Sequence, residues 1–305
     1  MQSLQMNEPD FPPQYDVAKN EPLSRHTSIR VGGPAQFFCT VKDPLLFVEL
    51  YRFCLSTDLP FLALGGGTNI FFSEAGRAGM VAAIRFDRMV TAGKAAIVVE
   101  AGASLEQISA LCLECGLSGF EFASGIPGTL GGAVYGNAGA YGRSIGELIV
   151  RARILTPEGR IETVDRDFFR FAYRSSYLKE YPAILLQAEL QLSKGEPVRI
   201  RAACEEILAL RRQKLPPPET PTAGSWFKNI ETGGERRQAA AVYLDAVGAK
   251  QTRVGDAAVH PKHANVFYNA GHATADQLLE LEEILRRRVL ERFGIRLERE
   301  VIYCE

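Results

Sequence analysis

Two glycine-rich stretches contain the residue types in this sequence best suited to binding an anion. The first, "GGGTN" at 65–69, follows an apolar segment, and its consecutive glycines can point successive backbone amides at one anion. The second, "GFEFASGIPGTLGGAVYGNAGAYG" at 119–142, interleaves glycines with apolar residues, which indicates a packed loop and not a flexible linker. Neither has a Rossmann or P-loop pattern. Each alone also fits a tight turn or an Ω-loop, but together they favour a large cofactor that carries phosphate.

A serine in an unusual setting is the next candidate for chemistry. Ser225 follows a glycine in "AGSWFKN", residues 223–229, and precedes two aromatic residues, a lysine and an asparagine. A hydroxyl can give a proton to carbon without placing a permanent charge there, but it needs neighbours that favour its transient alkoxide. Lys228, Asn229 and nearby backbone amides are the candidate neighbours. Taken alone, a serine after a glycine is more simply a turn residue.

The elements that must position these stretches have clear local signals. Helices are predicted over 44–59, 105–115, 198–213 and 275–293, and strands over 61–64, 70–86, 97–103, 148–164 as a hairpin, and 183–192. Capping boxes begin the second and fourth helices, at Ser104/Gln107 and Thr274/Gln277. The order is mixed, without a strict strand–helix alternation. It predicts an α+β protein of at least two lobes, with a seam near 195–222, where a proline run ends a helix.

Composition narrows the class of protein further. The chain has 305 residues, with 35 basic and 36 acidic side chains, so no global field recruits nucleic acid or an anionic membrane. The first twenty residues lack the apolar core of a signal peptide and no later run suits a membrane span. We therefore expect a cytoplasmic protein with a loose N-terminal tail. Of the six cysteines, Cys112 and Cys115 form a C-x-x-C pair late in a predicted helix, where packed thiols are favoured over a redox or zinc role.

Seven motifs in fixed order carry a resemblance to a known family. They are "RVGGPA" (30–35), "LGGGTN" (64–69), the segment 119–142, "YRSSYLK" (173–179), "AGSWFKN" (223–229), "KHAN" (262–265) and "FGIRLEREV" (293–301). Together they resemble the UDP-N-acetylenolpyruvoylglucosamine reductase family, in the shorter class that lacks an inserted tyrosine loop. The resemblance implies a two-lobed FAD-binding domain of the vanillyl-alcohol-oxidase (PCMH) type and a C-terminal α+β substrate-binding domain. The expected bounds are a flexible tail at 1–21, FAD lobes at 22–88 and 89–196, and the substrate domain at 197–305.

The resemblance also implies roles for particular residues. Arg174, Ser225 and Glu300 match the catalytic residues, with Ser225 as proton donor and Arg174 on the substrate carboxylate. The residues expected to bind FAD are Gly65, Gly66, Gly67, Thr68, Asn69, Gly125, Ile126, Pro127, Gly128, Thr129, Gly132, Asn137 and Gly139. Those expected to bind the nucleotide sugar are Tyr141, Arg174, Lys214, Ser225, Asn229 and His263.

The implied reaction is the NADPH-dependent reduction of an enolpyruvyl ether to a lactyl ether through FAD, in peptidoglycan precursor synthesis. Glu300 is useful beside an enolate only as an acid, which requires a pKa raised by burial. Alternation in an extended strand places Glu298 on the same face as Glu300, so spacing cannot separate the two. A small-molecule nucleotide sugar is the expected partner, with no nucleic acid, membrane or obligate protein partner.

Other functions stay open at this level. A different FAD-dependent oxidoreductase of the same fold, such as a sugar or hydroxy-acid oxidase, is one alternative, and a non-catalytic nucleotide-sugar binding module is another. A metal site is not expected, because His260 and His263 lack an evident third ligand. The chain departs from the family pattern at His26, where asparagine is common, and at Asp256, where glycine is usual.

Overall fold

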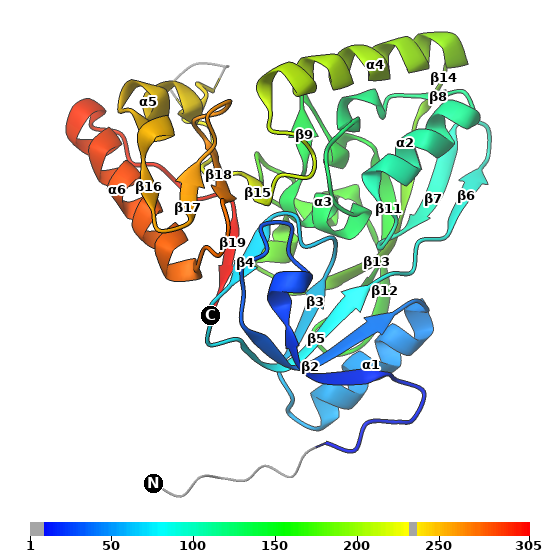
Figure 1. Cartoon of the computed structure of the whole chain (residues 1–305). Coiled ribbons are helices and arrows are strands. Elements are labelled where there is room, and N and C mark those ends of the chain that lie inside the picture. The colour runs from blue at the N-terminus through cyan, green and yellow to red at the C-terminus, as the bar shows by residue number, and fades with distance from the viewer. Residues whose placement is uncertain (1–8, 232–236) are drawn as a thin grey trace, which may run out of the picture.

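Three sheets of four or five strands, with helices packed around them, organise the protein in the computed structural model, which describes residues 9–231 and 237–305 (Figure 1). The first sheet has the strand order β1-β2-β5-β3, with bounds Val17–Pro22, Pro34–Val41, Arg77–Ile84 and Phe61–Leu64. β1 is antiparallel to β2, and the other pairings are parallel. Helix α1, Pro44–Ser56, packs on this sheet.

The second sheet is antiparallel throughout, in the order β12-β11-β13-β7-β6. Its strands are Ile161–Asp165, Ile149–Leu155, Ile184–Gln191, Ala96–Glu100 and Met89–Ala92. Helix α3, Leu130–Gly136, contacts β7 and β13, while α2, Leu105–Glu114, lies beside the short pair β8, Leu117–Ser118, and β14, Ser193–Lys194. A second short pair, β9, Gly139–Ala140, and β10, Arg143–Ser144, follows α3.

The third sheet belongs to the C-terminal unit, in the order β15-β18-β17-β16. Its strands are Thr222–Ser225, Val266–Asn269, Ala257–Val259 and Arg253–Val254, with helices α5, Ala240–Ala246, and α6, Ala275–Phe293. The chain then returns to the first lobe. The last strand β19, Ile302–Cys304, pairs in parallel with β4, Ile70–Phe72, directly after the "GGGTN" loop (Figure 1). This return brings Glu300 and Ile302 to Asn69 of that loop.

Two main cores reflect the same organisation. One continuous set of buried side chains runs from Phe37 and Phe47 under the first sheet to Ile97 and Leu190 under the second. A separate core fills the C-terminal unit and takes in Phe71 of β4. The two N-terminal sheets therefore share one apolar interior, and the C-terminal unit docks through β4.

Most helix boundaries follow the local signals in the sequence. Asp43 accepts hydrogen bonds from the Leu45 and Leu46 amides, and both predicted capping boxes are present. Helix α6 ends at Gly294, whose φ of +68° suits glycine. The predicted helices at these places are confirmed.

Part of the expected N-terminal tail, residues 11–21, is packed against the first sheet. Residues 1–8 lie outside the described residues, but the expectation of a flexible segment is wrong for Phe11 onward. Phe11 packs against Phe37 with ring centroids 5.0 Å apart, the Tyr15 hydroxyl donates to Leu46 O over 2.9 Å, and β1 adds an edge to the first sheet. A polar edge strand is hard to recognise because its alternation is weak and its pairing is not local.

Helix α4, Pro197–Lys214, packs on the second lobe, although the expected boundary at 197 gave it to the C-terminal domain. It contacts the 3-10 helix η2, Glu121–Ala123, and also α2 and β8, over which it lies in Figure 1. A Cβ added at Gly125 would meet Leu208 at 2.9 Å. The proline run after α4 marks the seam, so the helix before it stays with the lobe that it covers.

Candidate active site

The two glycine-rich loops approach each other so closely that added side chains would be crowded. The Thr68 hydroxyl lies 3.4 Å from Pro127 O. A Cβ added at Gly66 would come within 3.1 Å of the Gly128 Cα, and a Cβ at Gly128 within 2.9 Å of the Thr68 hydroxyl. Gly128 also has a φ of +122°, which side chains rarely adopt. Residues 65–69 and 125–132 therefore form one continuous cradle of backbone.

Several amides in this cradle have no protein acceptor. Within the described ranges, the backbone N–H groups of Gly66, Gly67, Thr68 and Gly128 donate no hydrogen bond. Converging free amides bind phosphate groups without any charged side chain. The cradle therefore fits the pyrophosphate of a dinucleotide cofactor, as FAD requires.

Some of the other predicted cofactor residues lie at the edge of the cradle, and others hold the backbone around it in place. Gly125, Ile126 and Pro127 form the rim of the cradle, while Thr129 caps α3 with a contact from the Gly132 amide, and Gly65 O accepts from Arg85. Asn137 is a support: its amide donates to Ala172 O over 2.8 Å and accepts from the Gly146 amide over 3.1 Å. Its side chain thereby holds the segment just before Arg174.

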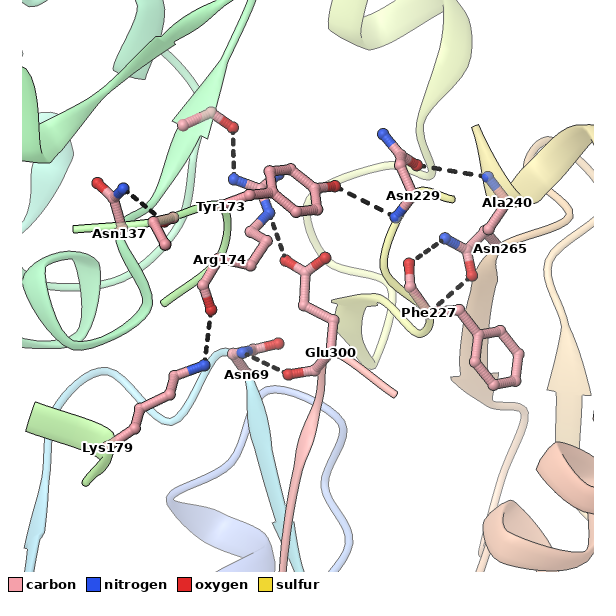
Figure 2. Close-up of polar contacts among 12 residues, drawn as sticks. Asn69, Asn137, Tyr173, Arg174, Lys179, Phe227, Asn229, Ala240, Asn265 and Glu300 are labelled. Carbon is pink, nitrogen blue, oxygen red and sulfur yellow. Dashed lines mark hydrogen bonds and ion pairs between the residues drawn. The ribbon is translucent and has the colours of Figure 1, made fainter. Parts of the chain in front are cut away.

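Arg174 and Glu300 form the central ion pair of the site. Arg174 Nε lies 2.8 Å from Glu300 Oε1, at the distance of an ion pair but without the angle of a hydrogen bond (Figure 2). Its Nη1 donates to Gly139 O over 2.8 Å, which joins the guanidinium to the loop after α3. The backbone φ of Arg174 is +52°, an uncommon value for a residue with a side chain. Such strain is concentrated at functional sites.

Three segments meet at Glu300. Its backbone amide donates to Trp226 O over 2.8 Å, and its carbonyl accepts from the Asn69 side chain over 3.3 Å. Glu300 is therefore bound to the cofactor loop through its carbonyl, and its side chain reaches Arg174 (Figure 2). Its amide binds the residue after Ser225. Burial raises the pKa of the Glu300 carboxyl, and the positive charges of Arg174, Lys179 and Lys228 oppose this shift without cancelling it.

The surroundings distinguish Glu300 from Glu298, which the sequence could not do. Residues 295–301 do not form the regular strand that we expected, and the strand begins only at Ile302. The side chain of Glu298 is 71% exposed and pairs with Lys228, whereas that of Glu300 is 18% exposed. The difference in burial, and not the spacing, favours Glu300 as the acid.

Ser225 ends β15, where the strand leaves regular pairing. The register with β18 shifts between Thr222 and Ser225, and Gly224 between them has a φ of +81°. The next residues are held by Asn265 of "KHAN", which accepts from the Phe227 amide over 2.9 Å and donates to Phe227 O over 2.8 Å (Figure 2). Ser225 is thus presented by a bulge on a clamped strand.

The predicted helpers of Ser225 do not contact its hydroxyl. Lys228 pairs with Glu298, while Asn229 donates its backbone amide to the Tyr173 hydroxyl over 3.2 Å and accepts from the Ala240 amide over 3.4 Å (Figure 2). Among the residues that the structure describes, none hydrogen-bonds the Ser225 hydroxyl. The expected relay through Lys228 or Asn229 is therefore absent from this arrangement.

The remaining candidates for substrate binding lie around this centre. Tyr141 sits exposed at the turn between β9 and β10, with a φ of +52°. Lys214 is exposed at the end of α4, and Lys262 donates to the backbone of the same helix end at Arg212 O over 3.1 Å. His263 follows Lys262 in the sequence, and its Nδ1 accepts a hydrogen bond from the Asn265 amide. Burial and the charge of Lys250 lower the pKa of His263.

Comparison with known proteins identifies the family. Residues 216–304 match the family model described as UDP-N-acetylenolpyruvoylglucosamine reductase, C-terminal domain, and residues 35–165 match an FAD binding domain. A reductase of that name from Lachnoclostridium phytofermentans is 40% identical over 93% of this chain and 92% of its own length. One from Syntrophus aciditrophicus is 39% identical over 93% and 91%. The chain belongs to the UDP-N-acetylenolpyruvoylglucosamine reductase family.

A solved structure of this reductase family agrees over the whole length. The enzyme from Thermus caldophilus superposes with a TM-score of 0.78 at 29% identity, covering 96% of this chain and 99% of that one. In the present reductase, residues 180–183 alone separate the 3-10 helix η5, Tyr177–Lys179, from β13. This short connection leaves no room for an inserted loop.

The two departures of this reductase from the family pattern have structural explanations. The His26 ring stacks on Phe38 with centroids 4.0 Å apart, and its Nε2 lies 2.9 Å from Glu21 Oε1. Its backbone carbonyl makes the contact with the cofactor loop, since a Cβ at Gly67 would lie 1.9 Å from it. Asp256 accepts from the His272 amide over 2.8 Å, so it fastens the loop before α6.

Reasoning from sequence missed Lys179 as a member of this site. Its ammonium donates to Arg174 O over 2.7 Å. The pKa of the Lys179 ammonium is lowered, mainly because the group is partly removed from water and also because the positive charge of Lys228 is near. Its place in "YRSSYLK", on the same motif as Arg174, was the available signal.

Alternative sites receive little support from the described part of the reductase. It holds no group of three or more His, Cys, Asp or Glu side chains that could bind a metal ion. Burial raises the pKa of Cys112 to about 12, so this thiol is inert as a nucleophile. Of the helices with described residues, none is long and apolar enough to cross a membrane.

Proposed function

We propose that this protein reduces UDP-N-acetyl-3-O-(1-carboxyvinyl)glucosamine to UDP-N-acetylmuramate, with FAD as its cofactor and NADPH as reductant. The observation that carries the proposal is the meeting of three segments at Glu300: the cofactor loop at Asn69, the arginine at 174 and the strand of Ser225. Relatives named UDP-N-acetylenolpyruvoylglucosamine reductase, which are similar over most of the chain, support it. The step belongs to peptidoglycan precursor synthesis, and free cysteines fit a reducing cytoplasm.

The free amides of residues 66–68 and 128 would hold the FAD pyrophosphate. The chemistry that FAD supplies when bound is hydride transfer, from NADPH and then to the terminal vinyl carbon of the substrate. Addition there leaves negative charge on the neighbouring carbon and its carboxylate. The remaining work of the protein is to stabilise that charge and to protonate that carbon.

Arg174 suits the first task. Gly139 O holds its Nη1, and its Nε is ion-paired with Glu300 without the angle of a hydrogen bond, so protonation of Glu300 would release the Nε for a substrate carboxylate. A planar guanidinium matches a carboxylate bidentately. Glu300 would donate a hydrogen bond to the developing enolate when it is protonated, which its burial favours.

Ser225 suits the second task, as the proton donor to carbon. Substrate binding would have to supply the neighbours that its hydroxyl lacks here, because Lys228 pairs with Glu298. Lys214 and His263, at the end of α4 and in "KHAN", would contact the nucleotide diphosphate and its surroundings, together with Tyr141 and Asn229.

The overall proposal has a direct test. NADPH added without oxygen should bleach the yellow protein, and the enolpyruvyl nucleotide sugar should then restore the colour in one turnover. The lactyl product should appear in equal amount to the flavin. Recolouring by oxygen but not by the nucleotide sugar would instead identify an oxidase, and a colourless protein would contradict both.

The raised pKa of Glu300 predicts a pH dependence for the second half of the reaction. The acid form is the active one, so the rate at which substrate reoxidises the flavin should fall as pH rises through this pKa. In Glu300→Gln this fall in rate with rising pH should disappear, because an amide donates a hydrogen bond without titrating. The rate of flavin reoxidation at low pH should be lower than in the wild type by only about tenfold. Stopped-flow across the pH range measures both. A limb that persists in Glu300→Gln would assign it to another group.

A further inference from the structure

A buried carboxylate behind the catalytic residues is the strongest feature that the reaction leaves unused. Glu282 lies on α6, and its side chain is only 4% exposed. Its Oε2 accepts from Trp226 Nε1 over 2.8 Å and from Arg299 Nε over 2.6 Å, while Oε1 lies 2.9 Å from Arg286. One oxygen thus joins two segments that are far apart in the sequence.

Both partners are direct neighbours of proposed catalytic residues. Trp226 follows Ser225, and Arg299 precedes Glu300. These two segments also pair through their backbones, because Glu300 donates to Trp226 O over 2.8 Å and Lys228 donates to Glu298 O over 2.8 Å. Arg299 turns to Glu282 while Glu300 turns to Arg174, as successive side chains of an extended segment do.

Stability alone does not account for such a carboxylate. Desolvation of buried charges offsets much of their attraction, and well-packed apolar side chains often replace them without loss. Charge-assisted hydrogen bonds are short and directional, however, so they fix the relative positions of the groups that they join. A shared acceptor at Oε2 fixes the Trp226 and Arg299 side chains relative to one point on α6.

We propose that Glu282 is a positioning residue for substrate reduction, which sets the distance between the Ser225 hydroxyl and the Glu300 carboxyl by holding Trp226 and Arg299. The proposal rests on the proposed function of these two residues. Glu282 touches neither substrate nor cofactor in this scheme. Its loss should therefore affect the protonation half of the reaction and leave NADPH oxidation unaffected.

The test compares Glu282→Gln with Glu283→Gln, the exposed neighbour on the same helix. Both holoproteins are checked for FAD content, and each half-reaction is followed by anaerobic stopped-flow. Glu282→Gln should slow flavin reoxidation by substrate about 10- to 100-fold and change flavin reduction by NADPH less than about twofold. Glu283→Gln should match the wild type in both.

A second readout does not depend on activity. Trp226 is the sole tryptophan, so ¹⁵N-labelled protein gives a single indole N–H cross-peak. Loss of the charged acceptor should move the indole proton upfield in Glu282→Gln but not in Glu283→Gln. Should Glu282→Gln fail to fold, Arg299→Gln tests the other contact, because the Arg299 side chain is partly exposed. Arg299→Gln should show the same selective slowing of flavin reoxidation, and its indole peak should change little.

The outcomes separate the two proposals. If the wild-type flavin is not reoxidised by the enolpyruvyl nucleotide sugar, the proposed function fails. If the wild type works and the indole peak moves, but reoxidation in Glu282→Gln stays normal, the positioning role is wrong. Equal slowing of both half-reactions, or loss of FAD, would make Glu282 a purely structural residue and also overturn the proposal.

Discussion

Ser225→Ala should reduce its flavin with NADPH at close to the normal rate, yet pass electrons to the enolpyruvyl substrate about 100- to 10,000-fold more slowly. The reason is the order of events. NADPH oxidation needs no proton on a substrate carbon, whereas substrate reduction is complete only when the carbon next to the carboxylate is protonated. Ser225 sits on the bulge at the end of β15 that presents it beside the Glu300 segment.

Anaerobic stopped-flow on each half-reaction measures this separation. Ser225→Cys is the informative companion, because a thiol keeps a proton to donate at the same place; it should retain more of the second half-reaction than alanine does. Ser193→Ala, an exposed serine on β14, is the neutral control. Parallel slowing of both halves in Ser225→Ala would make Ser225 a residue that shapes the cofactor pocket, and the proton donor would have to be sought elsewhere.

Local signals made much of the fold predictable. Caps at Asp43, Ser104 and Thr274 act within one helical turn, so neighbouring residues in the sequence suffice to locate them. The glycine loops were also recognisable, because closely spaced glycines are a property of the sequence itself. That the two loops lie opposite each other is a result of the fold and could not be read from the sequence.

What the sequence left open depends on burial and on distant pairing. Glu298 and Glu300 differ by two positions, but the return of the chain to β4 exposes one and buries the other. Asn137 was predicted as a cofactor residue, and the fold adds a contact that the sequence did not predict, from its side chain to the backbone before Arg174. Lys228 looked like a partner for Ser225 and instead pairs with Glu298. Each difference is set by which side chain reaches which segment in space.

Helix α4 illustrates the same limit at the level of domains. A proline run gives a strong boundary signal, but it does not tell to which side the preceding helix belongs. Leu208 and its neighbours pack over the rim of the cofactor cradle at Gly125, so α4 contributes to that lobe. The apolar stripe of the helix is weak, which is why its partner could not be read from periodicity.

Gly66→Val should yield folded protein without FAD, and therefore without either half-reaction. A Cβ at this position already comes within 3.1 Å of the Gly128 Cα, and the branched valine side chain adds two carbons in the space where free amides converge. Gly66 does not have a positive φ, so the substitution carries no backbone strain of the kind that Gly128→Val would carry. Its effect therefore reports the approach of the phosphates, and Gly66→Ala should fall between it and the wild type.

The measurement is visible flavin absorbance per protein, followed by titration of the apoprotein with FAD. Circular dichroism and thermal unfolding compare the variant with wild-type protein stripped of flavin, so that loss of binding is not confused with loss of fold. Gly93→Asn is the matched control for losing a turn glycine, because a Cβ there meets nothing within 4 Å and asparagine tolerates its φ of +61°; it should stay yellow. A yellow Gly66→Val with normal flavin affinity would remove residues 65–69 from the cofactor site and leave the long loop alone to hold the pyrophosphate.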